Sequence, residues 1–127
     1  MSSYIVKGGN RLEGTVKISG SKNSSLPIIA ATILNGGKTT LYNVPNIHDT
    51  QMMFEILKKI GAKVTKKKNK VIINTRDIKG YEIPEDLMRQ MRSSVIFAGS
   101  LLGKHRKCTL SYPGDCDIWL IHRTSLR

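Results

Sequence analysis

The chain has 127 residues, and its 21 Lys and Arg against 9 Asp and Glu give a formal net charge of +12. This length suits one domain or a part of a larger protein, and a hydrophobic fraction of 39% excludes a wholly disordered chain. The sequence has neither the apolar run of about 18 residues that a transmembrane helix needs nor the apolar core of a signal peptide near its start. Cys108 and Cys116 are too few for a disulfide framework or a four-thiolate zinc site, so we expect a reducing, cytoplasmic setting.

The first part of the chain predicts two strands and a helix. Residues 4–7 and 12–18 alternate as strands do, with a glycine turn at residues 8–10 between them. A small polar segment, residues 19–25, then leads into apolar residues at helical spacing that end at Asn35-Gly36-Gly37. The predicted apolar face of this helix consists of Leu26, Ile29, Ala30, Ile33 and Leu34.

The middle of the chain predicts a strand at residues 38–44 and then a second helix, with His48 or Asp49 near its N-terminus and Gly61 as its C-cap. A third helix is predicted to start at residues 83–86 and to end at Gly103. We expect the methionines at helical spacing to lie in the core rather than around a cofactor. The predicted buried stripes are Met52, Met53, Ile56, Leu57 and Ile60 in the second helix, and Leu87, Met91, Ser94, Val95, Ala98, Leu101 and Leu102 in the third.

Lysines are concentrated between the second and third helices. The segment Lys63–Lys70 leads into the apolar residues 71–74, a pattern that predicts two short strands joined by a tight turn at Lys68-Asn69. Lysines on such a hairpin commonly form a solvated edge that discourages sheets from pairing, and the alternative is an anion-binding role. No aromatic residue alternates with the lysines, so the segment does not predict a platform for stacked nucleic-acid bases.

The sequence also resembles itself at an offset of 69 residues. Ser24-Ser25 falls on Ser93-Ser94, and Thr40-Leu41 falls on Thr109-Leu110, where a strand is predicted at residues 107–111. Each copy is a helix rich in small residues followed by a short strand, which indicates a fold built by stacking repeated units.

Four segments carry a resemblance to a known family. These are Gly20–Pro27, Asn43–Thr50, Met91–Ser94 and Pro113–Ile118, and they match in order and spacing. Over residues 1–118 the chain resembles the bacterial UDP-N-acetylglucosamine 1-carboxyvinyltransferases of the enolpyruvyl transferase family.

The resemblance implies an α/β fold of the α+β type, in which repeated βαβαββ units form two similar domains of an inside-out α/β architecture, here incomplete. Residues 1–21 would be strands of the second domain, residues 22–118 an incomplete first domain, and residues 119–127 a divergent tail. The implied reaction transfers the enolpyruvyl group of phosphoenolpyruvate to the 3-hydroxyl of UDP-N-acetylglucosamine and releases phosphate, at the first committed step of peptidoglycan synthesis. The resemblance implies no metal or organic cofactor, and no nucleic-acid or membrane partner.

Site residues follow from the resemblance, position by position. Lys22 and Asn23 would bind phosphoenolpyruvate, Arg92 would contact the nucleotide sugar, and Cys116 would be the proton donor and the thiol trapped by fosfomycin. Each also has a plainer interpretation: a surface lysine, a helix N-cap, a solvated helix arginine and an incidental loop cysteine. We expect the Lys22 ammonium, at a helix N-terminus, and the Cys116 thiol to meet the same phosphorylated acid. Cys108 is expected to be a packed small hydrophobe.

The resemblance fails after Ile118. The arginine that the family places five residues after the cysteine falls on Ile121, and its role is not transferred to Arg123. A frameshift, a damaged gene, a deliberately shortened sequence and a wrong gene boundary all remain open as origins of this tail. We expect the 127-residue chain alone to be inactive and to associate with itself through open sheet edges. The alternatives are a basic nucleic-acid-binding module and the related 3-phosphoshikimate enolpyruvyl transferase, against which the cysteine loop argues.

Overall fold

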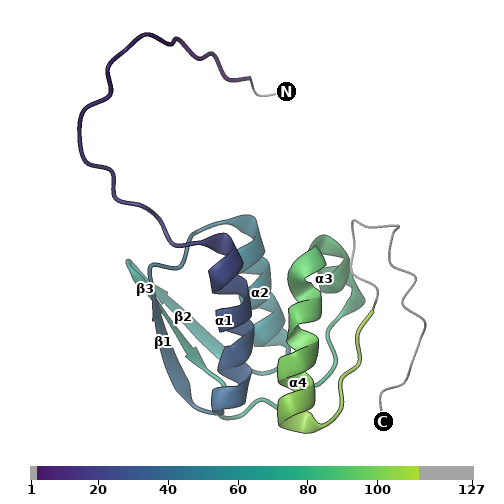
Figure 1. The fold of residues 1–127 in the computed structure, drawn as a ribbon. Helices are drawn as coiled ribbons and strands as arrows, with labels where there is room; N and C mark the ends of the chain where they lie inside the picture. The colour runs from purple at the N-terminus through teal and green to yellow at the C-terminus, as the bar shows by residue number, and fades with distance from the viewer. Residues whose placement is uncertain (1–2, 112–127) are drawn as a thin grey trace.

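Helices cover one face of a small antiparallel sheet, and no helix of residues 3–111 covers its other face (Figure 1). The structure, a computed structural model, describes residues 3–111, and no helix in that range is long and apolar enough to cross a membrane. It is a mixed helix and sheet fold, as expected. The elements in chain order are α1 (Lys22–Asn35), β1 (Lys38–Tyr42), α2 (His48–Lys59), β2 (Lys63–Lys67), β3 (Lys70–Asn74), α3 (Glu85–Gln90), the 3-10 helix η1 (Arg92–Ile96) and α4 (Phe97–His105).

The sheet has the strand order β1-β3-β2, with both pairs antiparallel. The turn at Lys68-Asn69 joins β2 to β3, which confirms the predicted hairpin. In the central strand β3, Val71 and Ile73 are buried toward the helices, whereas the alternate residues are only half-buried. The strand order makes β1 and β2 the edges of this sheet within residues 3–111.

The core lies between the sheet and the helices, where α1 packs against both α2 and α4. The predicted methionines are confirmed as core, since Met52, Met53 and Met91 are all buried. Leu34 was wrongly placed in the core: it is 57% exposed, while Thr32 of the same helix is buried. The reason is that Leu34 lies at the rim of the α1–α4 contact, where its Cδ2 atom approaches Gly103.

The predicted third helix is broken in the structure. Met91 has extended backbone angles, φ −149° and ψ 116°, and separates α3 from η1. The buried Ser94 hydroxyl donates a hydrogen bond of 2.6 Å to the Met91 carbonyl oxygen, across the start of η1. Val95, predicted to be buried, is 45% exposed beyond this break. The helix also continues past Gly103, because the left-handed residue that ends it is Arg106, with φ 57°.

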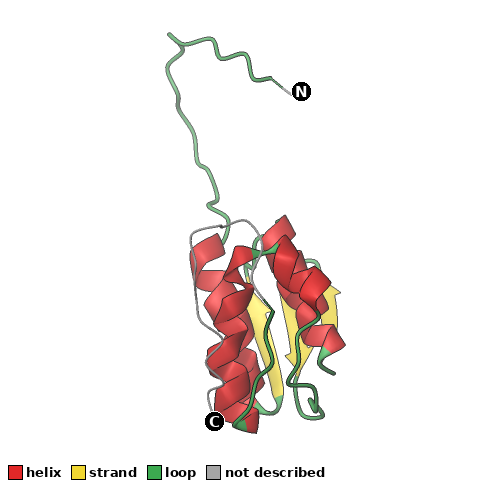
Figure 2. Ribbon diagram, turned by 90° about the vertical axis from the view of Figure 1, so that its right-hand side faces the viewer, coloured by secondary structure: helices red, strands yellow, loops and turns green. Residues whose placement is uncertain are grey.

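The predicted strands at both ends of the described region do not form. Residues 3–20 are extended but unpaired and project from the body as an arm (Figure 2). A strand requires hydrogen bonds from a neighbouring strand, and no segment within residues 3–111 supplies them to the arm. At residues 107–111 only an isolated bridge between Glu82 and Thr109 is present, so the strand of the second repeat copy is absent there.

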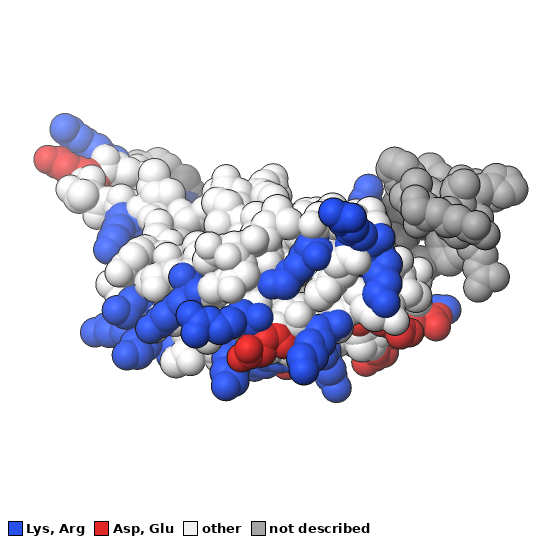
Figure 3. Space-filling view, turned by 90° about the horizontal axis from the view of Figure 1, so that it is seen from below, with Lys and Arg blue, Asp and Glu red and all other residues white. Residues whose placement is uncertain are grey.

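The helices α1, α2 and α4 share one direction. The N-termini of α1 and α2 meet through an ion pair between Lys22 and Asp49, and the C-terminal ends of α1 and α4 meet where Lys104 Nζ donates to the Ile33 carbonyl oxygen at 3.3 Å. The N-termini of α1, α2 and α4 therefore lie at the upper end in Figure 1. Lys and Arg dominate the opposite end (Figure 3), where cations offset the negative ends of helix dipoles.

Candidate active site

Lys22 is the first residue of α1, and Asn23 follows it in the first turn. The N-cap is Ser21, whose Oγ atom accepts a hydrogen bond from the Ser24 N–H at 3.4 Å. The interpretation of Asn23 as the N-cap is therefore wrong. The backbone N–H groups of Lys22 and Asn23 have no partner within the helix, so they present donors at its positive end.

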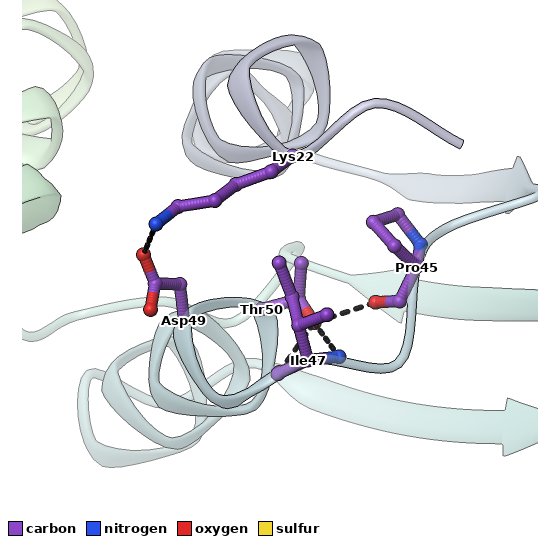
Figure 4. Close-up of polar contacts among 5 residues, drawn as sticks. All are labelled: Lys22, Pro45, Ile47, Asp49 and Thr50. Atoms are coloured by element: carbon purple, nitrogen blue, oxygen red, sulfur yellow. Dashed lines mark hydrogen bonds and ion pairs between the residues drawn. The ribbon is translucent and has the colours of Figure 1, made fainter. Parts of the chain in front are cut away.

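The charge at this end of α1 opposes the helix dipole. The first turn of α1 has no acidic residue and carries the Lys22 ammonium instead, although a cation is unfavourable at a helix N-terminus. Asp49, in the first turn of α2, lies opposite, with its Oδ2 atom 2.5 Å from Lys22 Nζ (Figure 4). The lysine side chain is half exposed and the aspartate mostly covered, so the ammonium remains accessible to a ligand.

The start of α2 is held by the buried hydroxyl of Thr50. This hydroxyl lies 2.7 Å from the Pro45 carbonyl oxygen and 2.9 Å from the Ile47 carbonyl oxygen, and it accepts a hydrogen bond from the Ile47 N–H at 3.3 Å (Figure 4). Ile47, the N-cap residue, has no side-chain acceptor for the N–H groups of the first turn, and Thr50 pairs the N–H of Ile47 itself. The network fixes the first turn of α2 and hence the position of Asp49.

Gly20 fixes where the chain enters α1. A Cβ atom added to Gly20 would lie 1.8 Å from the carbonyl oxygen of Asn43, so the backbone of the arm touches the loop after β1. Asn43 itself adopts a left-handed conformation, with φ 55°. The first and second motifs of the sequence therefore meet in space, and together they place Lys22 against Asp49.

Arg92 begins η1, directly after the break at Met91. The residue is exposed, and among residues 3–111 no hydrogen bond or ion pair joins its guanidinium to Lys22, Asn23 or Asp49. Met91 and Ser94, on either side of Arg92, are buried. The motif Met91–Ser94 therefore packs its apolar and small residues inward and leaves the arginine side chain exposed.

The predicted catalytic thiol of Cys116 lies outside the described residues, as do the rest of its loop and the tail at 119–127. Cys108 is half-buried and packs against the core, as expected. Burial raises the pKa of the Cys108 thiol. Its environment therefore favours the unreactive protonated form.

Metal ligands do not gather in the described region. No group of three His, Cys, Asp or Glu side chains within residues 3–111 is arranged to hold a metal ion. A hollow of about 650 Å³ borders the loop that contains Asn43 and Pro45, but Lys22, Asn23 and Arg92 do not line it.

Asp49 is the residue of this site that the sequence did not single out. Its position at the start of the second helix was expected, but its pairing with Lys22 joins two helices that lie well apart in the sequence. Only its place in the motif Asn43–Thr50 signalled a role.

The chain is similar to curated proteins named as UDP-N-acetylglucosamine 1-carboxyvinyltransferases. The chain is 46% identical over 118 residues to "UDP-N-acetylglucosamine 1-carboxyvinyltransferase 2" of Caldanaerobacter subterraneus subsp. tengcongensis, and 44% identical over 118 residues to "UDP-N-acetylglucosamine 1-carboxyvinyltransferase" of Methylacidiphilum infernorum. Each alignment covers 93% of this chain but 28% of the relative, so the chain spans less than a third of these proteins.

A solved structure supports the fold. The enolpyruvyl transferase NikO from Streptomyces tendae matches with a TM-score of 0.67 and 27% identity, over 77% of this chain and 23% of the other. The sequence model of EPSP synthase (3-phosphoshikimate 1-carboxyvinyltransferase) matches residues 6–119. With nearly the whole chain matched in this way, the protein belongs to the EPSP synthase family of enolpyruvyl transferases.

Proposed function

We propose that this chain is the N-terminal part of an enzyme that transfers the enolpyruvyl group of phosphoenolpyruvate to the 3-hydroxyl of UDP-N-acetylglucosamine. The observation that carries the proposal is the 46% identity to a relative of that name over 93% of the chain. The geometry at the α1 N-terminus supports it, because the donor substrate carries a phosphate and a carboxylate and this helix end presents an ammonium beside free N–H groups.

Lys22 and Asn23 are proposed to hold phosphoenolpyruvate. The ion pair with Asp49 keeps the Lys22 ammonium at the mouth of the helix before a ligand arrives, which lowers the entropy lost on binding. Arg92 is proposed to contact the nucleotide sugar, since its side chain is exposed at the break between α3 and η1. Cys116 is proposed as the proton donor on the basis of its loop motif, Pro113–Ile118.

The arm supports the proposed domain division. Residues 1–21 would complete a sheet in the second domain, residues 22–118 form part of the first domain, and residues 119–127 are a divergent tail. Within the described part of the arm, residues 3–20, the backbone is extended and unpaired while large apolar side chains are exposed, as expected of strands whose partners lie elsewhere.

The wider biology follows from the same proposal. The enzyme would act in the cytoplasm, supply the precursor of the cell wall needed for cell shape and division, and be inhibited by fosfomycin at Cys116. The 127-residue chain alone would be inactive, because one incomplete domain cannot enclose the reacting groups and exclude water.

The 3-phosphoshikimate reaction is the second candidate, because the matching family model carries that description. The names of the curated relatives favour the UDP-N-acetylglucosamine reaction instead. The two candidate reactions differ in the acceptor of the enolpyruvyl group, so measuring activity with each acceptor distinguishes them.

A chimera tests the proposal. Residues 1–118 of this chain would replace the matching segment of the Caldanaerobacter relative, and phosphate release would be measured with phosphoenolpyruvate and either acceptor. We expect release with UDP-N-acetylglucosamine and none with 3-phosphoshikimate. Lys22→Ala and Cys116→Ser should each lower kcat/KM by at least a hundredfold, about 2.7 kcal/mol of transition-state stabilisation.

The matched control is Lys38→Ala, which removes an exposed lysine at the opposite end of the molecule and should leave kcat/KM within twofold. Thermal unfolding of each chimera confirms that it is folded. A folded chimera that uses 3-phosphoshikimate, or one whose activity survives Lys22→Ala, would contradict the proposal.

A further inference from the structure

Helices α1 and α4 present an uncharged apolar surface to solvent. Beyond Lys22, α1 has no charged residue, and a helix without a polar side is one that neighbouring elements usually cover. Yet Ile28 and Leu34 are 50% and 57% exposed, and Val95, just before α4, is 45% exposed. This surface, here called the α1–α4 face, consists of Pro27, Ile28, Ala31, Leu34, Val95, Gly99 and Gly103, all exposed and none charged.

The other two helices expose ordinary polar surfaces. Their exposed residues are His48, Glu55, Lys58 and Lys59 in α2, and Glu85, Asp86, Arg89 and Gln90 in α3. The α1–α4 face is therefore distinct from the rest of the helical surface. Contiguous exposed apolar residues on a protein commonly mark a place where another segment or molecule packs.

The two helices contribute to one continuous surface. α1 and α4 pack against each other, and the Leu34 Cδ2 atom lies 2.9 Å from where a Cβ atom on Gly103 would be. Nothing lies within 4 Å of a Cβ atom placed on Gly99, so the backbone of α4 is directly accessible there. Aliphatic side chains beside accessible backbone suit a large apolar group that contacts both helices.

The sequence supplies a candidate for this group soon after the described residues end. Thr109 donates to the Tyr81 carbonyl oxygen at 3.0 Å and accepts from the Ile83 N–H at 3.2 Å, which fixes the chain near its exit from the described region at residue 111. Residues 118–121 read Ile-Trp-Leu-Ile, an apolar run that holds the only tryptophan of the chain. The family model ends at residue 119, so half of this run lies beyond the match to the family.

The apolar run is close enough in the chain to reach the α1–α4 face. After α4 the chain turns back at Arg106, with φ 57°, and runs toward the upper end of the molecule (Figure 1). Residues 112–118 can span about 23 Å when extended, whereas the axes of two packed helices lie about 8–10 Å apart. A segment tethered at this range has an effective concentration on the order of millimolar, which favours it over a second copy of the chain.

We propose that residues 118–121 pack across the α1–α4 face of the same chain, with Trp119 as the principal contact. The packing removes apolar surface from water on both sides, and tryptophan offers the largest apolar area of any side chain in the run. Asp117 and His122, which flank the run, remain in solvent. The divergent tail would thus act as a built-in cover for two helices of the first domain. This inference concerns packing alone and does not depend on the proposed reaction.

Trp119 reports on its own environment, because it is the only tryptophan in the chain. Its fluorescence in the folded 127-residue chain should lie at a shorter wavelength than in urea, and acrylamide should quench it less. Ile28→Lys with Leu34→Lys places two charges on the α1–α4 face and should return the emission to the longer wavelength. Thr40→Lys with Thr65→Lys is the matched control, since it adds the same charges at exposed positions of the sheet and should leave the emission unchanged.

Thermal unfolding separates loss of this contact from a general loss of folding. Ile28 and Leu34 are half exposed, so lysines there should lower the melting temperature only by releasing the tail. In a chain that carries Trp119→Ser with Ile121→Ser, the contact is already lost, and the same lysine pair should leave the melting temperature unchanged. An equal effect of the lysine pair in both backgrounds would overturn the inference.

A concentration series distinguishes the tail from a second copy of the chain. Shielding of Trp119 in chains that sediment as monomers would support packing within one chain. Shielding that appears only as dimers form would overturn the inference in favour of a second copy at the same face. A Trp119 as accessible to acrylamide in the folded chain as in urea, or equal shifts from the two lysine pairs, would also overturn it.

Discussion

The Lys22 ammonium and the Asp49 carboxylate, 2.5 Å apart, join the N-termini of two helices. Lys22 is a cation at the positive N-terminus of α1, where the helix dipole disfavours it. Asp49 is an anion at the positive N-terminus of α2, where the dipole favours it. Asp49 therefore compensates a charge that α1 alone would disfavour, and an anionic ligand at the same place would do so as well.

Asp49→Asn should destabilise the folded chain modestly. The substitution removes a partly exposed ion pair and a favourable first-turn charge from α2, which together contribute about 1 kcal/mol to the free energy of unfolding. Urea unfolding measures the change, and a double-mutant cycle with Lys22→Met isolates the coupling between the two side chains.

Glu55→Gln is the matched control, because Glu55 pairs with Lys58 on the exposed side of the same helix. We expect its effect to stay within about 0.5 kcal/mol. A coupling between Lys22 and Asp49 no larger than that between Lys58 and Glu55 would show that the first pair has no structural role.

Gly20→Ala should destabilise the entry into α1. The added methyl group would lie 1.8 Å from the Asn43 carbonyl oxygen, so either the arm or the loop must move, at a cost of about 1–3 kcal/mol. Gly8→Ala is the control in the same arm, since nothing lies within 4 Å of the new Cβ atom there. Equal urea midpoints for the two variants would refute the close contact.

Thr50→Val should weaken the start of α2. The substitution keeps the shape of the buried side chain but deletes the hydroxyl that meets Pro45 and Ile47, leaving the Ile47 N–H unpaired at a cost of about 1–3 kcal/mol. Thr40→Val, on the exposed face of β1, is the control and should be nearly neutral. If both variants unfold at the same denaturant concentration, the Thr50 hydroxyl does not stabilise the helix.

The helices α1 and α2 and the lysine hairpin were predictable because local signals agree there. Helical spacing, the glycine after α1 and the two-residue turn each depend on neighbours in the sequence. The break at Met91 was not predictable, because the helical spacing of apolar residues continues across it. The break coincides with the burial of Met91 and Ser94, which depends on their tertiary environment.

Contacts between residues that are distant in the sequence account for the other differences between the predicted and the observed structure. Alternation in the arm indicates strand-like residues correctly, but it does not say where a hydrogen-bonding partner lies. The sequence placed Lys22 at a helix start by its motif, whereas its contact with Asp49 arises only when α1 and α2 pack together.

The exposed apolar residues of the arm should cause self-association of the 127-residue chain. Ile5 and Val16 are 89% and 85% exposed, and both outer strands of the sheet have open edges. Ile5→Lys with Val16→Lys should therefore shift sedimentation toward the monomer. Asn10→Lys with Ser19→Lys adds the same charge at polar positions of the arm and should have a smaller effect. Equal shifts would assign the association to charge alone.

Cys108 should become reactive only at higher pH than an ordinary thiol. Burial raises its pKa, so at a given pH less of it is thiolate, and alkylation by iodoacetamide in a Cys116→Ser variant should be slow until the chain unfolds in urea. The raised pKa of Cys108 in the folded state also makes the stability of the chain depend on pH. The stabilising contribution of the protonated thiol is complete below the unfolded-state pKa and is lost as the pH rises through the folded-state pKa. Cys108→Ala should therefore flatten the decline in urea midpoint at alkaline pH, and a decline unchanged by the substitution would show that other groups cause it.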